Sequence, residues 1–400
     1  MNRPIIAVVV LFSVTSAALA QEVTEEKFLS ALDEGHVGVR SLRDGIARAE
    51  GARERAGTLA NPRFDFWREA PENNPRVTNW TVAWTPPLDG RYGLGKSAAE
   101  AGVAAARQRF EVDRAALRRE FRQAFARWSL GLESRDILQQ QLNLVTGLAE
   151  QARQRARVGE ESGLAARRLT LAEGEVRMAL GSADAEYVRA AAAARALRQD
   201  LPAETRPAPA TLPIPPAALD PGGASLLSAL EHEREQAEYE ARRLGRFVAF
   251  PTIQLGWQTI DDRPASDGGP ILAAGWPVPL FDRDQGSRLE AERLKDIAAA
   301  RLSFAQARVA AEVEGGLNAY RTLFAAARDA REVADGADQV IEAATASFRA
   351  GESGLTDLLD TLRSAFAARL RAVDARGLAL QAHRELEAVL GRPLAEGQER

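Results

Sequence analysis

Side chains that could do acid–base, nucleophilic or metal chemistry are scattered in this sequence. His36, His232 and His383 fall on three separate predicted helices, with no second ligand at metal-binding spacing. The carboxylates are spread along polar helix faces, and neither a nucleophile–base signature nor a phosphate loop occurs. The glycine-rich run Gly90–Gly95 follows a strand without phosphate-loop spacing and is interpreted as a bend into a helix. We therefore expect no enzyme activity, no cofactor and no metal site.

Two similar short segments join long Ala-rich runs. The sequence FRAGESGLTDLLD spans Phe348 to Asp360, and RVGEESGL spans Arg157 to Leu164. In both, a basic residue and a glycine precede an acidic residue and then Ser-Gly-Leu. Glycine ends a helix because it accepts positive φ, and serine can cap the next helix. Each segment predicts a tight helix–turn–helix, and the pair indicates an internal repeat.

Asp357 and Asp360 follow the second of these turns, three residues apart on one face of the next predicted helix. From the residues alone, a solvated first-turn pair favoured by the helix dipole explains them.

Bulk composition favours long helices in an exported protein. The chain has 400 residues, a formal net charge of −4 and no cysteine, so disulfides and an N-terminal lipid on cysteine are excluded and nothing suggests nucleic acid. Residues 1–20 have a basic start, an apolar core from Ile5 to Val14 and a small-residue cleavage site at Ala18-Leu19-Ala20 before Gln21. This pattern predicts a secretory signal peptide removed near Ala20/Gln21, with a retained membrane anchor as the alternative. No other run approaches 18 apolar residues.

Helical periodicity and proline spacing define the long elements. Helices are predicted at Thr24 to about Ala56, Lys96 to Arg155, Ala165 to about Arg198, Ser287 to Phe348, and Leu355 to about Leu390. A further helix is predicted to open the second repeat near Ala224. The segment from Pro202 to Pro221 holds seven prolines and is predicted to be a non-helical linker. The expected domains are therefore a first repeat at 21–201, a linker at 202–221 and a second repeat at 222–400.

Four short segments alternate with period two and predict strands. They lie at Arg63–Phe66, Asn79–Thr85, Thr252–Ile260 and Ile271–Val278, with loops at Ala70–Val77 and Asp261–Pro270. Each repeat therefore has the order helix, strand, strand, long helix, tip turn and return helix, starting at Thr24 and near Ala224.

These strands have one apolar aromatic face and one small or polar face. One chain cannot close four strands, because the smallest spanning barrels have about eight and an open edge is not tolerated in lipid. Pooling strands from several copies solves this, with lipid-facing or interfacial aromatics at Trp67, Trp80, Trp84, Trp257 and Trp276. The alternative is a soluble β-sandwich cap on a helical stalk.

With these features, the whole mature chain resembles the TolC-type outer-membrane efflux factors. The resemblance rests on the duplicated plan, on the prolines after each hairpin at Pro86-Pro87-Leu88 and Pro279-Leu280-Phe281-Asp282, and on the tip FRAGESGLTDLLD. The run from Pro277 to Gly286, with Asn61-Pro62, is similar to the heavy-metal (CzcC-type, cobalt–zinc–cadmium) branch.

The resemblance implies a mainly α fold with a small β part. Four strands per chain would contribute to a trimeric 12-stranded outer-membrane barrel on an α-helical periplasmic tunnel. The partners would be a periplasmic membrane-fusion adaptor and an inner-membrane pump of the RND type, with the protein itself a passive duct. Heavy-metal cations are the expected solute. The alternative functions are a soluble periplasmic scaffold or adaptor protein, and an outer-membrane duct for type I protein secretion.

The resemblance also implies site residues. Asp357 and Asp360 match an acidic ring at the periplasmic entrance, which would concentrate cations at a narrow mouth. The tip turns match the adaptor-docking grooves; their residues are Arg157, Gly159, Ser162, Gly163, Arg349, Gly351, Ser353 and Gly354. Some closed family members lock the entrance with a tyrosine and an arginine beside the turn glycine. Phe348 and Ser353 occupy these positions here, so the same lock is not expected.

Overall fold

The computed structural model describes residues 22–33, 35–72, 75–158, 163–246, 251–262, 265–278 and 280–394. The predicted signal peptide, Gly159 and Ser162 lie outside these residues. Within them the chain is mainly helical, and no described helix is long and apolar enough to cross a membrane.

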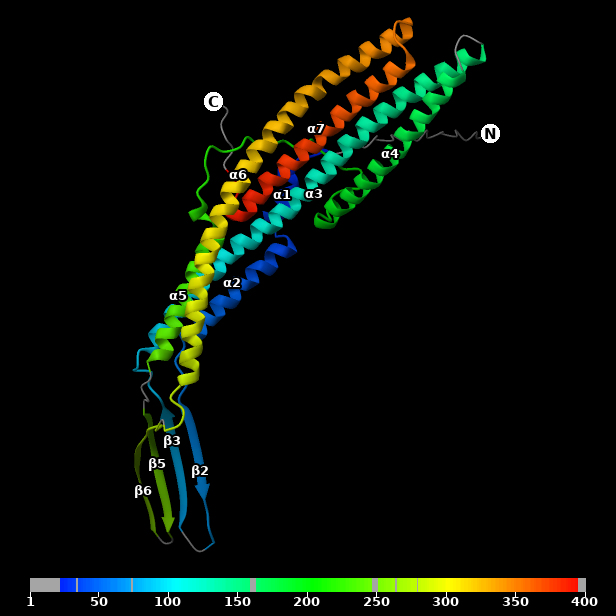
Figure 1. Ribbon diagram of the computed structural model, residues 1–400. Coiled ribbons are helices and arrows are strands. Elements are labelled where there is room, and N and C mark those ends of the chain that lie inside the picture. Colours follow the sequence, from blue (N-terminus) through cyan, green and yellow to red (C-terminus); the bar gives the residue numbers. More distant parts are fainter. Residues whose placement is uncertain are drawn as a thin grey trace, which may run out of the picture. The chain divides into compact units, whose positions relative to one another are not determined.

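Both halves contain the order helix, two strands, long helix and return helix, and the first half has one additional helix before the strands (Figure 1). The first half contains α1 (Glu25–Asp33), α2 (Val37–Ala56), β2 (Arg63–Glu69), β3 (Arg76–Trp84), α3 (Arg91–Arg157) and α4 (Gly163–Leu197). The second contains α5 (Ser225–Gly245), β5 (Thr252–Asp262), β6 (Ala265–Gly275), α6 (Gln285–Ala350) and α7 (Leu355–Leu390). Short pieces β1 (Glu22–Val23), β4 (Arg206–Pro207) and η1 (Pro221–Gly223) complete the order. The predicted long and return helices are confirmed, and residues 202–220 contain no helix.

The prediction of one helix from Thr24 to about Ala56 is wrong. Helix α1 ends at Asp33, just before Gly35, which adopts φ +95°, a conformation that other residues rarely accept. His36 is then the N-cap of α2, because its Nδ1 accepts a hydrogen bond from the Gly38 amide at 3.1 Å. One of the three histidines therefore has a structural role.

Two compact units are present, and each takes segments from both halves of the sequence. The first comprises the described parts of residues 1–33, 121–212 and 326–380. Its core brings α3, α4, α6 and α7 together around Leu148, Leu169, Leu358, Leu362 and Phe366. A second cluster stacks Phe28 of α1 on Phe121 and Phe125 of α3, with ring centroids 5.6 Å apart in both pairs.

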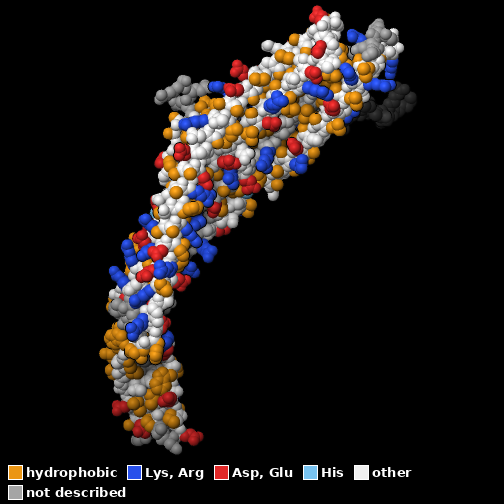
Figure 2. All heavy atoms as spheres, in the orientation of Figure 1, with side chains coloured by type: hydrophobic (Ala, Val, Ile, Leu, Met, Phe, Trp, Pro, Cys, Tyr) orange, Lys and Arg blue, Asp and Glu red, His pale blue; other side chains and the backbone are white. Residues whose placement is uncertain are grey.

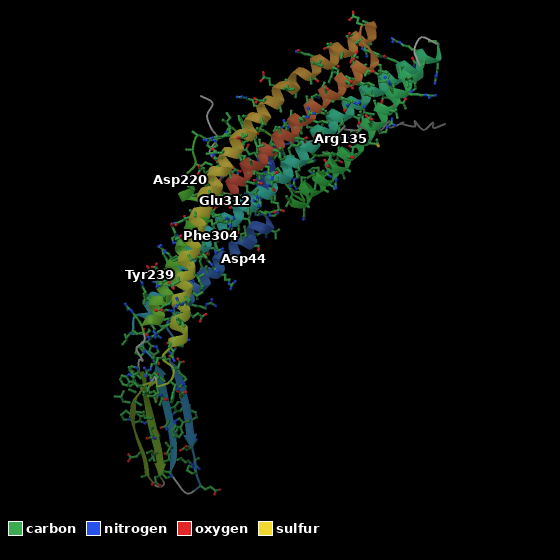
Figure 3. All side chains as sticks on the ribbon, in the orientation of Figure 1. Asp44, Arg135, Asp220, Tyr239, Phe304 and Glu312 are labelled. Atoms are coloured by element: carbon green, nitrogen blue, oxygen red, sulfur yellow. The ribbon has the colours of Figure 1, made fainter. Side chains whose placement is uncertain are left out.

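Polar contacts tie the helices of the first unit together. Arg135 of α3 donates to Asp184 of α4 at 2.6 Å and lies 5.7 Å from the Tyr187 ring centre (Figure 3). The proline-rich segment is anchored by the Ser129 hydroxyl, which donates to the Ala208 carbonyl at 2.8 Å. Strands β1 and β4 pair in parallel over two residues, a contact too short to be predicted from periodicity.

The second unit comprises residues 34–120, 213–325 and 381–400, as far as these are described. An apolar stripe of α6 is buried, with Val309, Val313 and Tyr320 at most 3% exposed. The Tyr320 hydroxyl donates to the Pro213 carbonyl, and its ring lies 5.2 Å from that of His383. A hydrogen bond with Glu233 raises the pKa of Arg109 above its ordinary value, and this contact joins α3 to α5.

The second unit also contains a four-stranded antiparallel sheet of order β2-β3-β5-β6. Strands β3 and β5 come from different halves, so the sheet joins the two repeats. Strands β2 and β6 are its edges, and neither has a second partner among the described residues.

The boundaries of the second hairpin differ from the prediction. The segment Asp261–Pro270 was expected to be a loop, but β5 continues to Asp262 and β6 begins at Ala265. Pro270 is tolerated because β6 is an edge strand, where a missing N–H removes no ladder hydrogen bond. The strand also stops earlier, so Trp276 and Val278 lie beyond its end.

Candidate functional sites at the helical tip and on the sheet

The second predicted tip turn is a glycine-terminated helix end. Gly351 adopts φ +77°, its amide donates to the Phe348 carbonyl at 3.1 Å, and the Glu352 amide donates to the Ser347 carbonyl at 3.0 Å. These two bonds form a Schellman motif, which satisfies carbonyls at the end of α6. The predicted glycine turn is therefore confirmed at Gly351.

Ser353 does not cap α7, contrary to the prediction. The Gly354 carbonyl accepts from the Leu358 amide at 3.1 Å and so begins the helix, while the Ser353 hydroxyl is buried without a hydrogen-bond partner. Arg349 is exposed at the end of α6. At the first tip, Arg157 ends α3 and Gly163 begins α4, and both are exposed.

The two tips lie side by side in the first unit. Arg168, one turn into α4, donates to the Thr356 hydroxyl at the start of α7 at 3.2 Å. Ala166 and Leu355 pack against the same core as Phe348. The fold therefore brings together two turns that are about 190 residues apart in sequence, which sequence spacing alone does not show.

Asp357 and Asp360 are both exposed in the first two turns of α7. Asp360 also borders a groove of about 590 Å³ between α6 and α7, lined by small residues including Gly336, Ala337 and Ser364. Glu332 lies on the same groove. The structure thus leaves both carboxylates accessible to solvent and to ions, as an electrostatic role would require.

The sheet has one continuous apolar face. Its cross-strand rows are Phe64–Val82–Leu255–Leu272 and Phe66–Trp80–Trp257–Pro270, followed by Trp84–Ile253–Ala274. The Phe66 and Trp80 rings lie 4.5 Å apart, yet both side chains remain about half exposed. This confirms the predicted alternation and shows that nothing in the chain's described residues covers this face.

The opposite face is polar or small over much of its length. It carries Asp65, Thr81 and Gly256 in one row, and Asn79, Gln258 and Gly269 in the next. Trp67 lies opposite Asn79 and therefore shares this polar face. The register thus separates Trp67 from Trp80, Trp84 and Trp257, which share the apolar face. The role of these residues as lipid-facing or interfacial aromatics stays a prediction.

Part of the chain matches a known protein family and a characterised relative. Residues 224–392 match the family described as outer membrane efflux protein. The chain is 27% identical over 280 residues to the cobalt–zinc–cadmium resistance protein CzcC of Cupriavidus metallidurans, an alignment covering 64% of this chain and 65% of CzcC. The matched part is therefore slightly less than two thirds of that relative's length.

Solved structures share the fold over nearly the whole chain. A structure of CusC, described in terms of transmembrane channel formation, matches with a TM-score of 0.76 at 15% identity, covering 94% of this chain and 96% of CusC. The outer membrane protein VceC of Vibrio cholerae matches with a TM-score of 0.73 at 14% identity, covering 92% and 96%. The predicted resemblance and fold class are confirmed, and the matches are to efflux proteins, in agreement with the prediction that the chain is not an enzyme. The chain is therefore similar to outer membrane efflux proteins, and the match to the family model lies in its second half.

Proposed function

We propose that this chain forms a trimeric outer-membrane duct, through which an inner-membrane pump and a periplasmic adaptor expel solutes. The observation that carries the proposal is the four-stranded sheet, which has a continuous exposed apolar face and two edges that no other described strand pairs with. Such a sheet is unfavourable in water and in lipid unless its edges are closed. Three copies would close twelve strands into one wall, with the apolar face toward lipid and the polar face toward an aqueous lumen.

Heavy-metal cations are the solute that we propose. The support is the similarity to CzcC, whose name states cobalt, zinc and cadmium resistance, together with the exposed carboxylates at the tip. In a trimer, Asp357 and Asp360 from each subunit would form an acidic ring that raises the local cation concentration. The duct would supply no energy of its own.

Fractionation of cells tests the location and the assembly. We expect the protein in the outer-membrane fraction, released only by detergent, with a gel mobility that changes on heating because the barrel unfolds. Release into the soluble periplasmic fraction by osmotic shock alone would contradict the proposal and favour a helical scaffold with a β cap.

Planar-bilayer conductance tests the acidic ring. Asp357→Asn with Asp360→Asn should lower the cation conductance and the cation-over-anion selectivity of the reconstituted trimer. Asp329→Asn is the matched control, since Asp329 is an exposed carboxylate on α6 outside the tip. Equal losses in both variants, or no loss in either, would remove the role of the tip carboxylates.

Adaptor docking at the tip turns is tested by crosslinking. Gly351→Trp places a bulky side chain on the exposed turn and should reduce adaptor crosslinks while trimers persist on native gels. Deletion of the gene should lower tolerance to cobalt, zinc or cadmium. Unchanged tolerance with loss of a secreted protein would favour type I secretion instead.

A further inference from the structure

A small cavity lies between the interior of α3 and the end of α7, within the second unit. Its volume is about 50 Å³, several times the roughly 10–15 Å³ that one water needs. The side chains from α3 are spaced so that they share one face of that helix. The charged residues of the lining are Glu111, Arg114, Arg118, Arg119, Glu387 and Arg392. Four arginines against two glutamates leave the lining with a formal charge of +2.

Three of these arginines make no ion pair within the part of the chain that the structure describes. They are Arg118, Arg119 and Arg392, whereas Arg114 lies 3.9 Å from Glu111. The Nε atom of Arg118 is buried and donates to no acceptor among the described residues. A buried guanidinium N–H without an acceptor is unfavourable, so an acceptor in the cavity would stabilise the fold.

The end of α7 holds Arg392 beside the cavity. Gly391 adopts φ +70°, and the Arg392 amide donates to the Glu387 carbonyl at 3.3 Å, which closes a tight turn. The guanidinium packs against η1, because its Nη2 lies 3.2 Å from the place where a Cβ on Gly223 would stand. The Glu387 carboxylate accepts from the Leu394 amide at 3.1 Å, so part of its hydrogen-bonding capacity serves the backbone. The arginine is therefore positioned before any ligand binds.

Unpaired arginines are not the rule on these helices. Basic and acidic side chains are interspersed over the face shown in Figure 2. In the same unit Arg242 lies 3.6 Å from Glu238, and Arg293 lies 3.4 Å from Asp296. The negative end of the α7 dipole favours Arg392, but the arginines of α3 are in the interior of their helix, where the dipole gives no such reason. The positive charge around the cavity therefore requires an anion.

We infer that this cavity binds a small oxyanion of the phosphate class, which joins the end of α7 to α3. Guanidinium groups donate paired N–H bonds to such oxyanions, and their planar fork matches the spacing of the oxygens. The volume admits one tetrahedral oxyanion and is far below the several hundred Å³ that a nucleotide-sized ligand occupies. The inference goes beyond the proposed duct and does not depend on it. Free inorganic phosphate and the phosphate of a lipid headgroup share this chemistry, so the experiment separates them.

Calorimetric titration of the full chain, purified in dodecyl maltoside, tests the inference. Inorganic phosphate is added at constant ionic strength, and a short-chain phosphatidylglycerol is added in a parallel series. Arg118→Gln with Arg392→Gln removes two donors from the cavity. Arg242→Gln with Arg293→Gln is the matched control, since it removes the same charge from exposed positions of the same unit. Glu111→Gln removes an opposing charge from the lining.

We expect saturable binding of inorganic phosphate to the unmodified chain, and the same affinity in the control pair. The cavity pair should bind about tenfold or more weakly, because two charge-assisted hydrogen bonds are lost. Glu111→Gln should bind about 2–5-fold more tightly, because a repulsive charge is gone, and misfolding cannot produce such a gain. Circular dichroism checks that each variant keeps its helix content.

Absence of saturable binding to the unmodified chain, or equal affinity in the cavity pair and the control pair, would overturn the inference. If the cavity pair loses helix content, Glu111→Gln decides, and an unchanged affinity there overturns the inference as well. Saturable binding of phosphatidylglycerol without binding of inorganic phosphate would support the site with lipid as the source of the phosphate group, and the reverse result would support it with the free anion.

Discussion

The glycine at the end of α6 allows a prediction whose size follows directly from the geometry. Gly351 has φ +77°, and no atom lies within 4 Å of the place where a Cβ would stand. Gly351→Ala therefore adds no clash, and its whole effect is the unfavourable left-handed conformation, about 1–2 kcal/mol. This energy acts on the last turn of α6, where the Schellman bonds from Gly351 and Glu352 hold the chain.

Hydrogen exchange measures this local effect. A loss of about 1–2 kcal/mol should speed exchange of the amides of the last α6 turn by about 5–30-fold, if they exchange through local opening. Amides in the middle of α6 should be unaffected. The tip is the suitable reporter because its opening need not unfold the rest of either unit.

Two further variants make the reasoning refutable. Gly351→Asn should have a smaller effect, because asparagine accepts the left-handed region more readily than alanine. Gly315→Ala, in the interior of α6 with equally open space, should stabilise the helix by up to about 1 kcal/mol. If Gly351→Ala left exchange unchanged, or if Gly315→Ala destabilised as much, the argument from positive φ would be refuted.

Three other substitutions test the sheet, the core and an ion pair. Gly256→Ala should prevent heat-modifiable trimers from forming, because its Cβ would overlap the Trp80 carbonyl oxygen in the neighbouring strand. Leu362→Ala, at a side chain 1% exposed, should lower the free energy of unfolding by about 2–5 kcal/mol in guanidinium titrations followed by circular dichroism. Arg198 lowers the pKa of Asp200 by a hydrogen bond, so this pair stabilises the fold above about pH 4 and loses that effect as the pH falls. Since Asp200 is largely exposed, Asp200→Asn should cost less than about 0.5 kcal/mol at pH 7 and reduce the acid sensitivity below about pH 4.

Matched controls accompany the first two. Gly275→Ala lies at the end of the same sheet with no atom within 4 Å of the new Cβ, and it should assemble normally. Leu378→Ala, at a half-exposed side chain on α7, should change the free energy of unfolding by less than about 0.5 kcal/mol. Normal assembly of Gly256→Ala, or equal losses from the two leucines, would contradict the packing on which these predictions depend.

The long helices were predictable because their signals are local and repeated. Absence of proline, a regular apolar stripe and glycine at the tips are each sufficient to place α3, α4, α6 and α7 within a few residues. The break between α1 and α2 could not be predicted from the sequence, because it depends on a single positive φ at Gly35 and on a histidine N-cap, which is uncommon. Glycine within a helical pattern does not by itself indicate which conformation it adopts.

In the strands, period-two alternation predicts which side chains share a face of the sheet, whereas the aromatic character of a residue does not. Trp80, Val82 and Trp84 were assigned to one face by their spacing, and the register agrees. Trp67 is one residue from Phe66 and three from Phe64, and the register accordingly places it on the other face. Gly268, Gly269 and Pro270 fall in the predicted loop Asp261–Pro270 but belong to β6, an edge strand in which proline is tolerated.

The pairing of the two tip turns could not be predicted from the sequence and is seen only in the folded structure. Each turn could be recognised in the sequence, but the contact of Arg168 with Thr356 depends on how α4 and α7 pack against one core. A single sequence carries no signal for that pairing. The orientation of Asp360 toward the groove beside α6 likewise depends on the helix pairing and not on the three-residue spacing from Asp357.

The apolar surfaces that the chain leaves uncovered point to one common requirement. On α4, Leu171 and Met178 are seven residues apart and both 70% exposed, which is the spacing of a helix face that packs on another helix. The sheet leaves its aromatic face and both edges open as well. Because exposed apolar area of this extent is unfavourable in water, and open strand edges are unfavourable in lipid, neither solvent stabilises the isolated chain. In the proposed duct, assembly with further copies would close the edges and cover the helix faces, and lipid would cover the aromatic face. Insertion and oligomerisation are therefore expected to be coupled, so that a variant impaired in one should be impaired in the other.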